Sequence, residues 1–264
     1  MLMPSAQGLD QALDRNARIA RLRLLLPALE GAPPADAPAL PFHLLEVDHA
    51  LPARGLAVGA LHEIAPAGDS HMAAAFGFAA ACLAGAGFKT PSLLVVPNRF
   101  VGAYGAPYGH GLHLLGLDPG HLLIFTAGDH KAALWAAEEA LRSGGVGSVL
   151  ALLTGPLDLK TSRRLHLAAA STGTFLTVVR PARAEPAGAA VSRWRIAAAP
   201  ARRCRFDGFE GTRWRVALER ARNGRAGSWL MEWDHGAHRF RVAGALAGEA
   251  PPAGPAGPRL LRAG

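Results

Sequence analysis

The residues best placed for chemistry lie in the loop from Pro66 to Ala73, between a short apolar strand and a long apolar helix. A glycine-containing loop at such a junction is where many proteins bind the phosphates of a nucleotide. That task needs inward-facing backbone N–H groups, a lysine for the β and γ phosphates, and a Ser or Thr for magnesium. The residues at the candidate positions are instead Pro66, Gly68, Asp69, Ser70, His71, Met72 and Ala73.

These residue types fail all the requirements together. Pro66 has no N–H and a fixed φ, while Met72 carries no charge and Ala73 has no oxygen for magnesium. Asp69 would place a negative charge beside a triphosphate. The loop is therefore predicted to be a structural turn. Binding of a nucleotide through Ser70 and a helix N-terminus is the weaker alternative.

The sequence gives even less support for a metal site or a hydrolase site. The spacing i, i+3 occurs in two histidine pairs, His110 with His113 and His235 with His238. No cysteine pair completes a zinc site, so solvated surface is the simpler interpretation of these pairs. Ser70 and His71 are neighbours without a third partner, and no G-x-S-x-G motif is present. No catalytic residue, metal or cofactor is predicted.

The elements around the loop predict an α/β domain. Apolar runs indicate strands at 59–64, 92–96, 122–125, 148–153 and 174–179, and helices at 73–85, 131–142 and 160–171. A glycine-rich loop is expected from 100 to 111, followed by a short element at 112–115. Strands that alternate with helices are typical of a mostly parallel central sheet with helices on both faces.

The last third has a different pattern. In SRWRI (192–196) and TRWRV (212–216) arginines alternate with apolar residues, which predicts half-buried strands. GSWLMEWD and HRFRVAG complete an antiparallel extension. The alternation favours Trp194 and Trp214 as core residues over stacking platforms for bases.

Positive charge is concentrated in this region. Residues 180 to 225 contain twelve arginines and four acidic residues, so this segment alone carries +8, the formal charge of the whole chain. A localised basic face favours phosphate, nucleic acid or an acidic partner, although ordinary solvated arginines stay an alternative. The candidate contacts are Arg193, Arg195, Arg202, Arg203, Arg205, Arg213, Arg215, Arg220, Arg222 and Arg225.

Four segments are expected along the chain. They are an N-terminal helix in 1–30 (Leu9 to Leu29), a Pro/Ala linker at 31–41, the core domain at 42–243 and a flexible tail at 244–264. Charged residues interrupt the N-terminus, so a secretory signal is not expected. The apolar run Met72 to Phe88 is too weakly hydrophobic to span a bilayer. Two distant cysteines fit a reducing compartment, and a cytoplasmic location is predicted.

Three stretches resemble the RecA-type ATPase core. VDHALPARGLAVGALHEI (47–64) is similar to its first segment, through Asp48, Ala50, Leu51, Gly55, Leu56, Gly59, Glu63 and Ile64. ALWAAEEALRSGGVGSVLAL (133–152) resembles the helix and strand that carry the Walker B element. RARNGRAGSW (220–229) resembles a basic turn in which Lys-x-Arg precedes Gly-x-x-Gly, with Arg220 and Arg222 at the basic positions and Gly224 and Gly227 at the glycines.

Residues 42 to 242 as a whole, including the ending WLMEWDH, are similar to the ImuA family. These are RecA-like accessory proteins of bacterial damage-induced mutagenesis. The resemblance implies a RecA-like three-layer fold and a non-catalytic adaptor in SOS translesion DNA synthesis. Its implied partners are ImuB, an error-prone DNA polymerase III alpha-type subunit and RecA, with location at the nucleoid after DNA damage.

The catalytic residues of RecA-type enzymes are missing from the matching positions. No acidic residue ends the strand SVLALL, and Pro97-Asn98-Arg99 stands where a water-activating glutamate is placed. The resemblance therefore implies a retained fold and a lost ATPase. In RecA/DnaB-type motors the basic turn reaches a neighbour's nucleotide, so Arg220 and Arg222 are hypothesised to contact ATP bound to RecA, or an acidic surface.

Three alternatives stay open. The arginines could bind single-stranded DNA directly, or the chain could be an active ATPase. It could also be a division inhibitor similar to SulA, a related protein that lacks the nucleotide loop and acts on FtsZ. The arginine-rich segment and the WLMEWDH ending favour ImuA, because SulA is shorter and lacks such a region.

Overall fold

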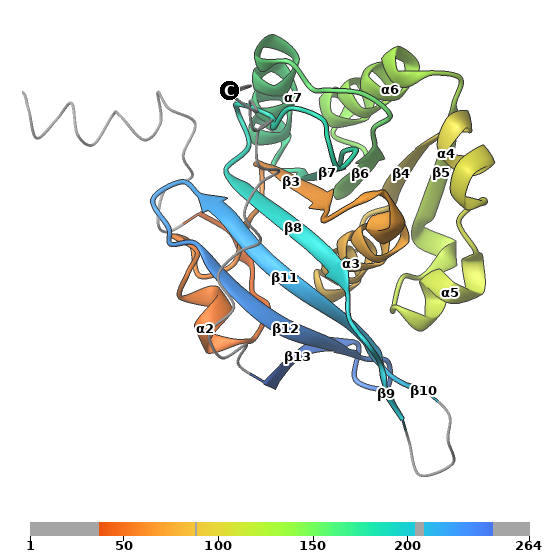
Figure 1. Ribbon diagram of the computed structural model, residues 1–264. Helices are drawn as coiled ribbons and strands as arrows, with labels where there is room; N and C mark the ends of the chain where they lie inside the picture. Colours follow the sequence, from red (N-terminus) through yellow and green to blue (C-terminus); the bar gives the residue numbers. More distant parts are fainter. Residues whose placement is uncertain (1–36, 88, 204–208, 245–264) are drawn as a thin grey trace, which may run out of the picture.

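The structure is a computed structural model that describes residues 37–87, 89–203 and 209–244. Its main feature is a nine-stranded sheet with the order β13-β12-β11-β8-β3-β7-β6-β4-β5 (Figure 1). In chain order the strands are β3 (Leu61–Pro66), β4 (Ser92–Pro97), β5 (Leu122–Ala127), β6 (Ser148–Leu152), β7 (Phe175–Val179), β8 (Ser192–Ala198), β11 (Thr212–Ala221), β12 (Gly227–Asp234) and β13 (Arg239–Gly244). Two short pairs join β1 (Ala39–Leu40) to β2 (Leu56–Ala57) and β9 (Arg202–Arg203) to β10 (Phe209–Glu210).

The sheet has a parallel half and an antiparallel half. From β8 across to β5 all neighbouring strands are parallel, whereas β11, β12 and β13 pair antiparallel. The predicted architecture, a mostly parallel sheet with an antiparallel extension, is confirmed. The strand SRWRI joins the halves, because β8 is parallel to β3 and antiparallel to β11.

Helices cover both faces of the parallel half, as predicted. The helices are α2 (Leu45–Asp48), α3 (Met72–Gly85), α4 (Asn98–Tyr104), α5 (Gly109–Leu114), α6 (His130–Ser143) and α7 (Leu159–Thr172). Alternate residues of each strand pack with α3 on one face and with α6 and α7 on the other. The expected loop at 100–111 is wrong, because α4 and α5 take up most of it, with only residues 105–108 between them.

The ends of α6 and α7 follow from their sequences. Asp129 and Asp158 cap the two helices, accepting hydrogen bonds from the N–H groups of Ala132 and Thr161, each at 2.7 Å. Each helix is followed by a glycine in the left-handed region, which is the usual termination signal. These signals explain why both helices were predicted to within one residue at each end.

An aromatic cluster joins the antiparallel half to α3. Phe78 of α3 lies with its ring centroid 6.2 Å from Trp194, 5.8 Å from Trp214 and 5.5 Å from Phe240. Trp194 and Trp214 are each 1% exposed, which confirms their prediction as core residues. Burial of rings of this size is a major source of stability, so α3 anchors both halves of the sheet.

The expected N-terminal helix (Leu9 to Leu29), the C-terminal tail beyond Gly244 and most of the 31–41 linker lie outside the described residues. Among the helices that are described, none has the length and hydrophobicity that a bilayer-spanning segment requires.

Candidate functional site

The loop after β3 is a closed turn. A short 3₁₀ helix, η1 (Asp69–His71), leads directly into α3. The Ala67 N–H donates to the carbonyl oxygen of Ile196 at 2.8 Å, and the His71 N–H donates to that of Gly68 at 2.9 Å. The Met72 N–H donates to the Asp69 carbonyl oxygen. A phosphate cradle needs such N–H groups to face the ligand, and these three already have acceptors within the protein.

The side chains of the loop fit a structural role. Met72 stands at the position that matches the phosphate-binding lysine. It is the first residue of α3, is 5% exposed, and packs its side chain in the core. The Nδ1 atom of His71 accepts a hydrogen bond from the Ala198 N–H at 3.2 Å, which fastens the loop to the end of β8. Asp69 and Ser70 are exposed, as is Ala73. The predicted loop residues are therefore brought together, but as a turn held by the neighbouring strand.

The space beside the loop is apolar. A cavity of about 620 Å³ lies between the first turns of α3, the end of α5 and the adjoining ends of β8 and β11. Small residues such as Ala73, Gly77 and Ala198 line most of it. Arg213 also lines it, but its Nε atom lies 2.6 Å from a carboxylate oxygen of Glu232. A polyphosphate in this cavity would have no unpaired arginine or lysine among the lining residues.

The ends of β6 and β4, at the same edge of the sheet, carry no acidic side chain. Strand β6 ends at Leu152 and is followed by Leu153 and Thr154. The next acid, Asp158, caps α7. Strand β4 ends at Pro97, from which α4 begins directly. The acidic side chain needed to hold magnesium or activate water is thus missing from both strand ends.

Two acidic residues of the RecA-like motif have structural partners. Asp48 accepts hydrogen bonds from the N–H groups of Phe42 at 2.8 Å and Leu44 at 3.0 Å. Burial raises the pKa of the Asp48 carboxyl, and the two N–H donors partly oppose that shift. This carboxylate fixes the turn through which the chain enters α2.

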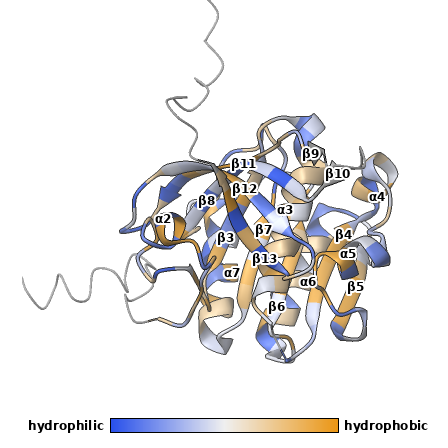
Figure 2. Cartoon of the chain, turned by 90° about the horizontal axis from the view of Figure 1, so that it is seen from below, coloured by the Kyte–Doolittle hydropathy of each residue, from blue (hydrophilic) through white to orange (hydrophobic). Residues whose placement is uncertain are grey.

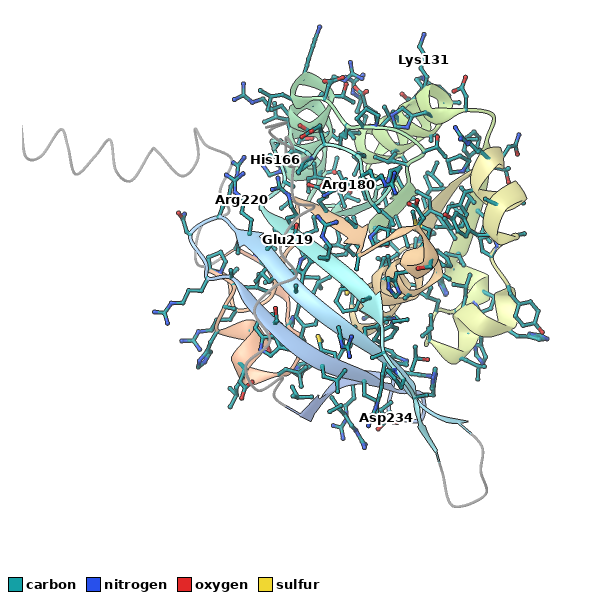
Figure 3. All side chains as sticks on the ribbon, viewed as in Figure 1. Lys131, His166, Arg180, Glu219, Arg220 and Asp234 are labelled. Atoms are coloured by element: carbon teal, nitrogen blue, oxygen red, sulfur yellow. The ribbon has the colours of Figure 1, made fainter. Side chains whose placement is uncertain are left out.

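Glu63 is the centre of a buried ionic group. Its side chain is fully buried and forms an ion pair with Arg180, which is itself 1% exposed. A second oxygen of Glu63 lies 3.2 Å from Arg193 Nε and accepts the Ala187 N–H at 2.9 Å. The Nη1 atom of Arg180 donates to the carbonyl oxygen of Ala184 at 2.7 Å. This group holds the 180–191 crossover against the sheet, with Arg180 in the interior of the molecule (Figure 3).

The first and last RecA-like motifs touch each other. A Cβ atom at Gly224 would lie 2.4 Å from the Ala50 carbonyl oxygen, so only glycine fits there. The Arg225 N–H donates to the same oxygen at 2.9 Å. The basic turn therefore packs on the segment that begins the core, which gives both motifs a packing explanation.

The predicted arginine contacts divide into paired and exposed side chains. Arg195 lies 2.5 Å from Glu219, and the pairs of Arg193 and Arg213 are described above. The Nη2 atom of Arg222 donates to the Gly188 carbonyl oxygen at 2.9 Å. Arg215, Arg220 and Arg225 are exposed, and Arg220 lies near one end of the β8–β11 pair (Figure 3). Nothing is described for the side chains of Arg202, Arg203 and Arg205, of which Arg205 lies outside the described residues.

A buried polar chain that the sequence analysis did not single out lies beside Glu63. Trp194 Nε1–H donates to Ser192 Oγ at 2.8 Å, and that hydroxyl lies 2.7 Å from His62 Nδ1. His62 Nε2 lies 2.8 Å from the Ala57 carbonyl oxygen. Burial lowers the pKa of His62 to about 4, so the ring is neutral at pH 7. Polar residues within the otherwise apolar strand LHEI were the signal for this group.

The histidine pairs do not form a metal centre in the described part of the chain. No group of three or more His, Cys, Asp or Glu side chains there is arranged to hold an ion. His235 is within hydrogen-bond distance of the Leu114 carbonyl oxygen (2.9 Å) and of Thr212 Oγ1 (3.2 Å). It therefore ties the β12–β13 turn to α5.

Comparison with known proteins gives the family. No protein-family profile matches this chain. Two curated proteins do match, each called Protein ImuA, from Caulobacter vibrioides strains NA1000 / CB15N and ATCC 19089 / CIP 103742 / CB 15. Each is 34% identical over 248 residues, covering 88% of this chain and the full length of the relative. Because this identity extends over nearly the whole chain, and because the fold is a RecA-like α/β fold, the chain belongs to the ImuA family.

Proposed function

We propose that this chain is a non-catalytic RecA-like adaptor in damage-induced translesion DNA synthesis. The observation that carries the proposal is the closed loop after β3. Its N–H groups at Ala67, His71 and Met72 are bonded within the protein, and the position of the phosphate-binding lysine is occupied by a buried methionine. A RecA-like scaffold that does not hold a triphosphate acts by binding other macromolecules.

We propose three partners, which the resemblance to the ImuA family implies. They are ImuB, an error-prone DNA polymerase III alpha-type subunit and RecA, and the adaptor would join them at damaged DNA. Exposed cations at Arg220 and Arg225 on the basic turn supply a surface for an acidic or phosphate-bearing partner. The contact with RecA is assigned to this turn.

Calorimetry with Mg-ATP tests the loss of the ATPase. We expect no heat of binding and no phosphate release from the purified chain. The matched variant restores the missing side chains with Met72→Lys and Ala73→Thr together. It should also fail to bind, because the internally bonded N–H groups and not only the side chains close the loop. Magnesium-dependent binding with turnover by the unaltered chain contradicts the proposal.

Charge reversal tests the basic turn. Arg220→Glu is the cleanest change, because reversal at Arg222 would also break its hydrogen bond to Gly188. Loss of one attractive charge and gain of a repulsive one should weaken RecA binding by about tenfold. The control is Arg163→Glu on the exposed surface of α7. Equal affinity of Arg220→Glu and the unaltered chain for RecA would remove the turn from the interface.

Direct binding of single-stranded DNA is a second candidate. It is favoured by one observation: Arg215 on β11 is exposed, and Figure 1 shows a face of β8, β11 and β12 that no described helix covers. Against it, the neighbouring arginines Arg195 and Arg213 are paired with glutamates. Contact with six phosphates would give a log–log salt slope of about −4. A flat response to salt excludes this function.

A further inference from the structure

Strand β5 leaves an apolar edge uncovered at one end of the sheet. Among the described strands it pairs with β4 alone. Leu123 is 52% exposed, Ile124 48% and Phe125 39%. By contrast, all residues of β6 and β7 are buried. Figure 2 shows β5 at the margin of the sheet, with hydrophobic residues along it.

This edge lacks the usual protection against pairing. Proteins commonly block edge strands with charged residues or proline. Strand β13, at the opposite end of the sheet, carries Arg239 and Arg241. The sequence LLIFTA of β5 has neither a charge nor a proline. The unpaired backbone groups of β5 therefore lie beside apolar side chains on both of its faces.

We propose that two copies of this chain pair through β5 to form a twofold-symmetric dimer. In a continuous antiparallel sheet, residues opposite each other point to the same face. A twofold axis at Ile124 meets this condition. It places Leu123 opposite the partner's Phe125, and Ile124 opposite the partner's Ile124. All three exposed apolar side chains are then covered at once.

The faces of the strand agree with this register. Leu123 and Phe125 lie beside Leu93 and Val95 of β4, on the face that carries α6. Ile124 lies beside Leu94, on the face that carries α3. The dimer therefore forms a Leu–Phe cross-strand pair twice on one face and an Ile–Ile pair on the other. Such apolar pairs stabilise antiparallel strands.

The character of β5 itself identifies a second copy as the occupant. The strand must be extended and apolar on both faces, and β5 itself meets both requirements, so the contact is self-complementary.

Sedimentation and light scattering across a wide range of concentration test the dimer. The unaltered chain should be a dimer, and Ile124→Lys should raise the dissociation constant by at least about tenfold, since two like charges meet at the axis. The control Leu167→Lys changes an apolar residue of α7 that is 66% exposed and should leave the dimer intact. This test does not depend on the proposed adaptor role, since no partner protein is present.

Cross-linking tests the register. In a Cys204→Ser background, Ile124→Cys should give a disulfide-linked dimer on mild oxidation, whereas Leu167→Cys should not. Cys82 is buried and does not compete. A monomer at all concentrations overturns the proposal, as does a dimer unaffected by Ile124→Lys. A monomer whose β5 amides resist hydrogen exchange also overturns it, because another segment then occupies the edge.

Discussion

The two halves of the sheet differ in where their paired charges lie, in the interior in one half and at the surface in the other. In the parallel half, Glu63 and Arg180 are 0% and 1% exposed and pair with each other inside the protein. Between β8 and β11, where the antiparallel half begins, Arg195 and Glu219 are 27% and 33% exposed on a face open to water. Desolvation makes a buried charge costly once its partner is lost, whereas water screens a surface pair. The fold should therefore depend on few charges in the parallel half and on none of the surface arginines singly.

This difference bears on function. In the parallel half, Glu63 holds the crossover at Ala187, and the loop from Pro66 to Met72 is closed by backbone hydrogen bonds. The polar groups of this half stabilise the scaffold. The exposed arginines of the antiparallel half, such as Arg215 and Arg220, should contribute little to the stability of the fold, and their side chains are accessible from solvent.

The largest expected effect is that of Glu63→Gln. This change leaves the Arg180 guanidinium buried without a countercharge, which should cost about 3–5 kcal/mol of unfolding free energy. Urea denaturation followed by circular dichroism measures it. The control is Glu139→Gln, on an exposed position of α6. A loss below about 1 kcal/mol for Glu63→Gln would mean that the buried pair behaves as a surface pair, and the comparison would fail.

The next effect is the loss of stability in acid caused by His62. Its pKa is about 4 in the folded protein and 6.5 ordinarily. Between those pH values the unfolded chain binds the proton and the folded chain does not, so stability falls as pH decreases through this window. The full loss is about 3 kcal/mol, reached near pH 4.

Urea titrations at several pH values between about 7.5 and 4.5, which span most of that window, measure how the free energy of unfolding depends on pH. His62→Gln removes the titrating ring and should flatten the slope, even if the variant is less stable at every pH. Replacement of His110, which is exposed on α5, is the matched control and should keep the slope. Identical slopes for the unaltered chain and His62→Gln would show that His62 is not the source.

Much of the fold could be predicted from the sequence, because local signals agree with the tertiary structure. Short apolar runs such as SVLALL favour a buried strand, and Asp129 and Gly144 mark the two ends of α6. The segment 100–111 was mispredicted because its glycines and proline suggest a loop. There, helices α4 and α5 form because Phe100 and Leu112 are buried in the core. That stabilisation comes from tertiary packing and leaves little trace in local propensity.

The candidate site was predictable where it depended on residue type and not where it depended on pairing. Residue type alone indicated that the lysine and the Ser or Thr of a phosphate loop are replaced, by Met72 and Ala73. The partners of Glu63 are more than a hundred residues away along the chain, at Arg180 and Arg193. The exposure of β5 depends on its place at the edge of the sheet, and strand order is set by topology.

A smaller effect is expected at the contact between the halves. Gly77 lies inside α3, and a Cβ atom there would meet Trp214 at 3.8 Å, an ordinary van der Waals distance. Gly77→Ala should therefore stabilise the protein by about 0.5–1 kcal/mol through helix propensity. The contrasting variant is Gly224→Ala, which should destabilise because its Cβ would lie 2.4 Å from the Ala50 oxygen. Thermal unfolding of both variants checks the signs.

The smallest effect is that of Glu219→Gln on the open face. The pair with Arg195 is about one-third exposed, so its removal should cost about 0.5 kcal/mol or less, and high salt should shrink the difference further. A double-mutant cycle with Arg195→Gln isolates the coupling between the two side chains. The cycle is needed because Arg195 also donates to the Pro66 carbonyl oxygen at 3.4 Å, a contact that Glu219→Gln leaves in place. A salt-independent coupling above about 2 kcal/mol would make the open face as dependent on its charges as the interior, and would end the distinction between the halves.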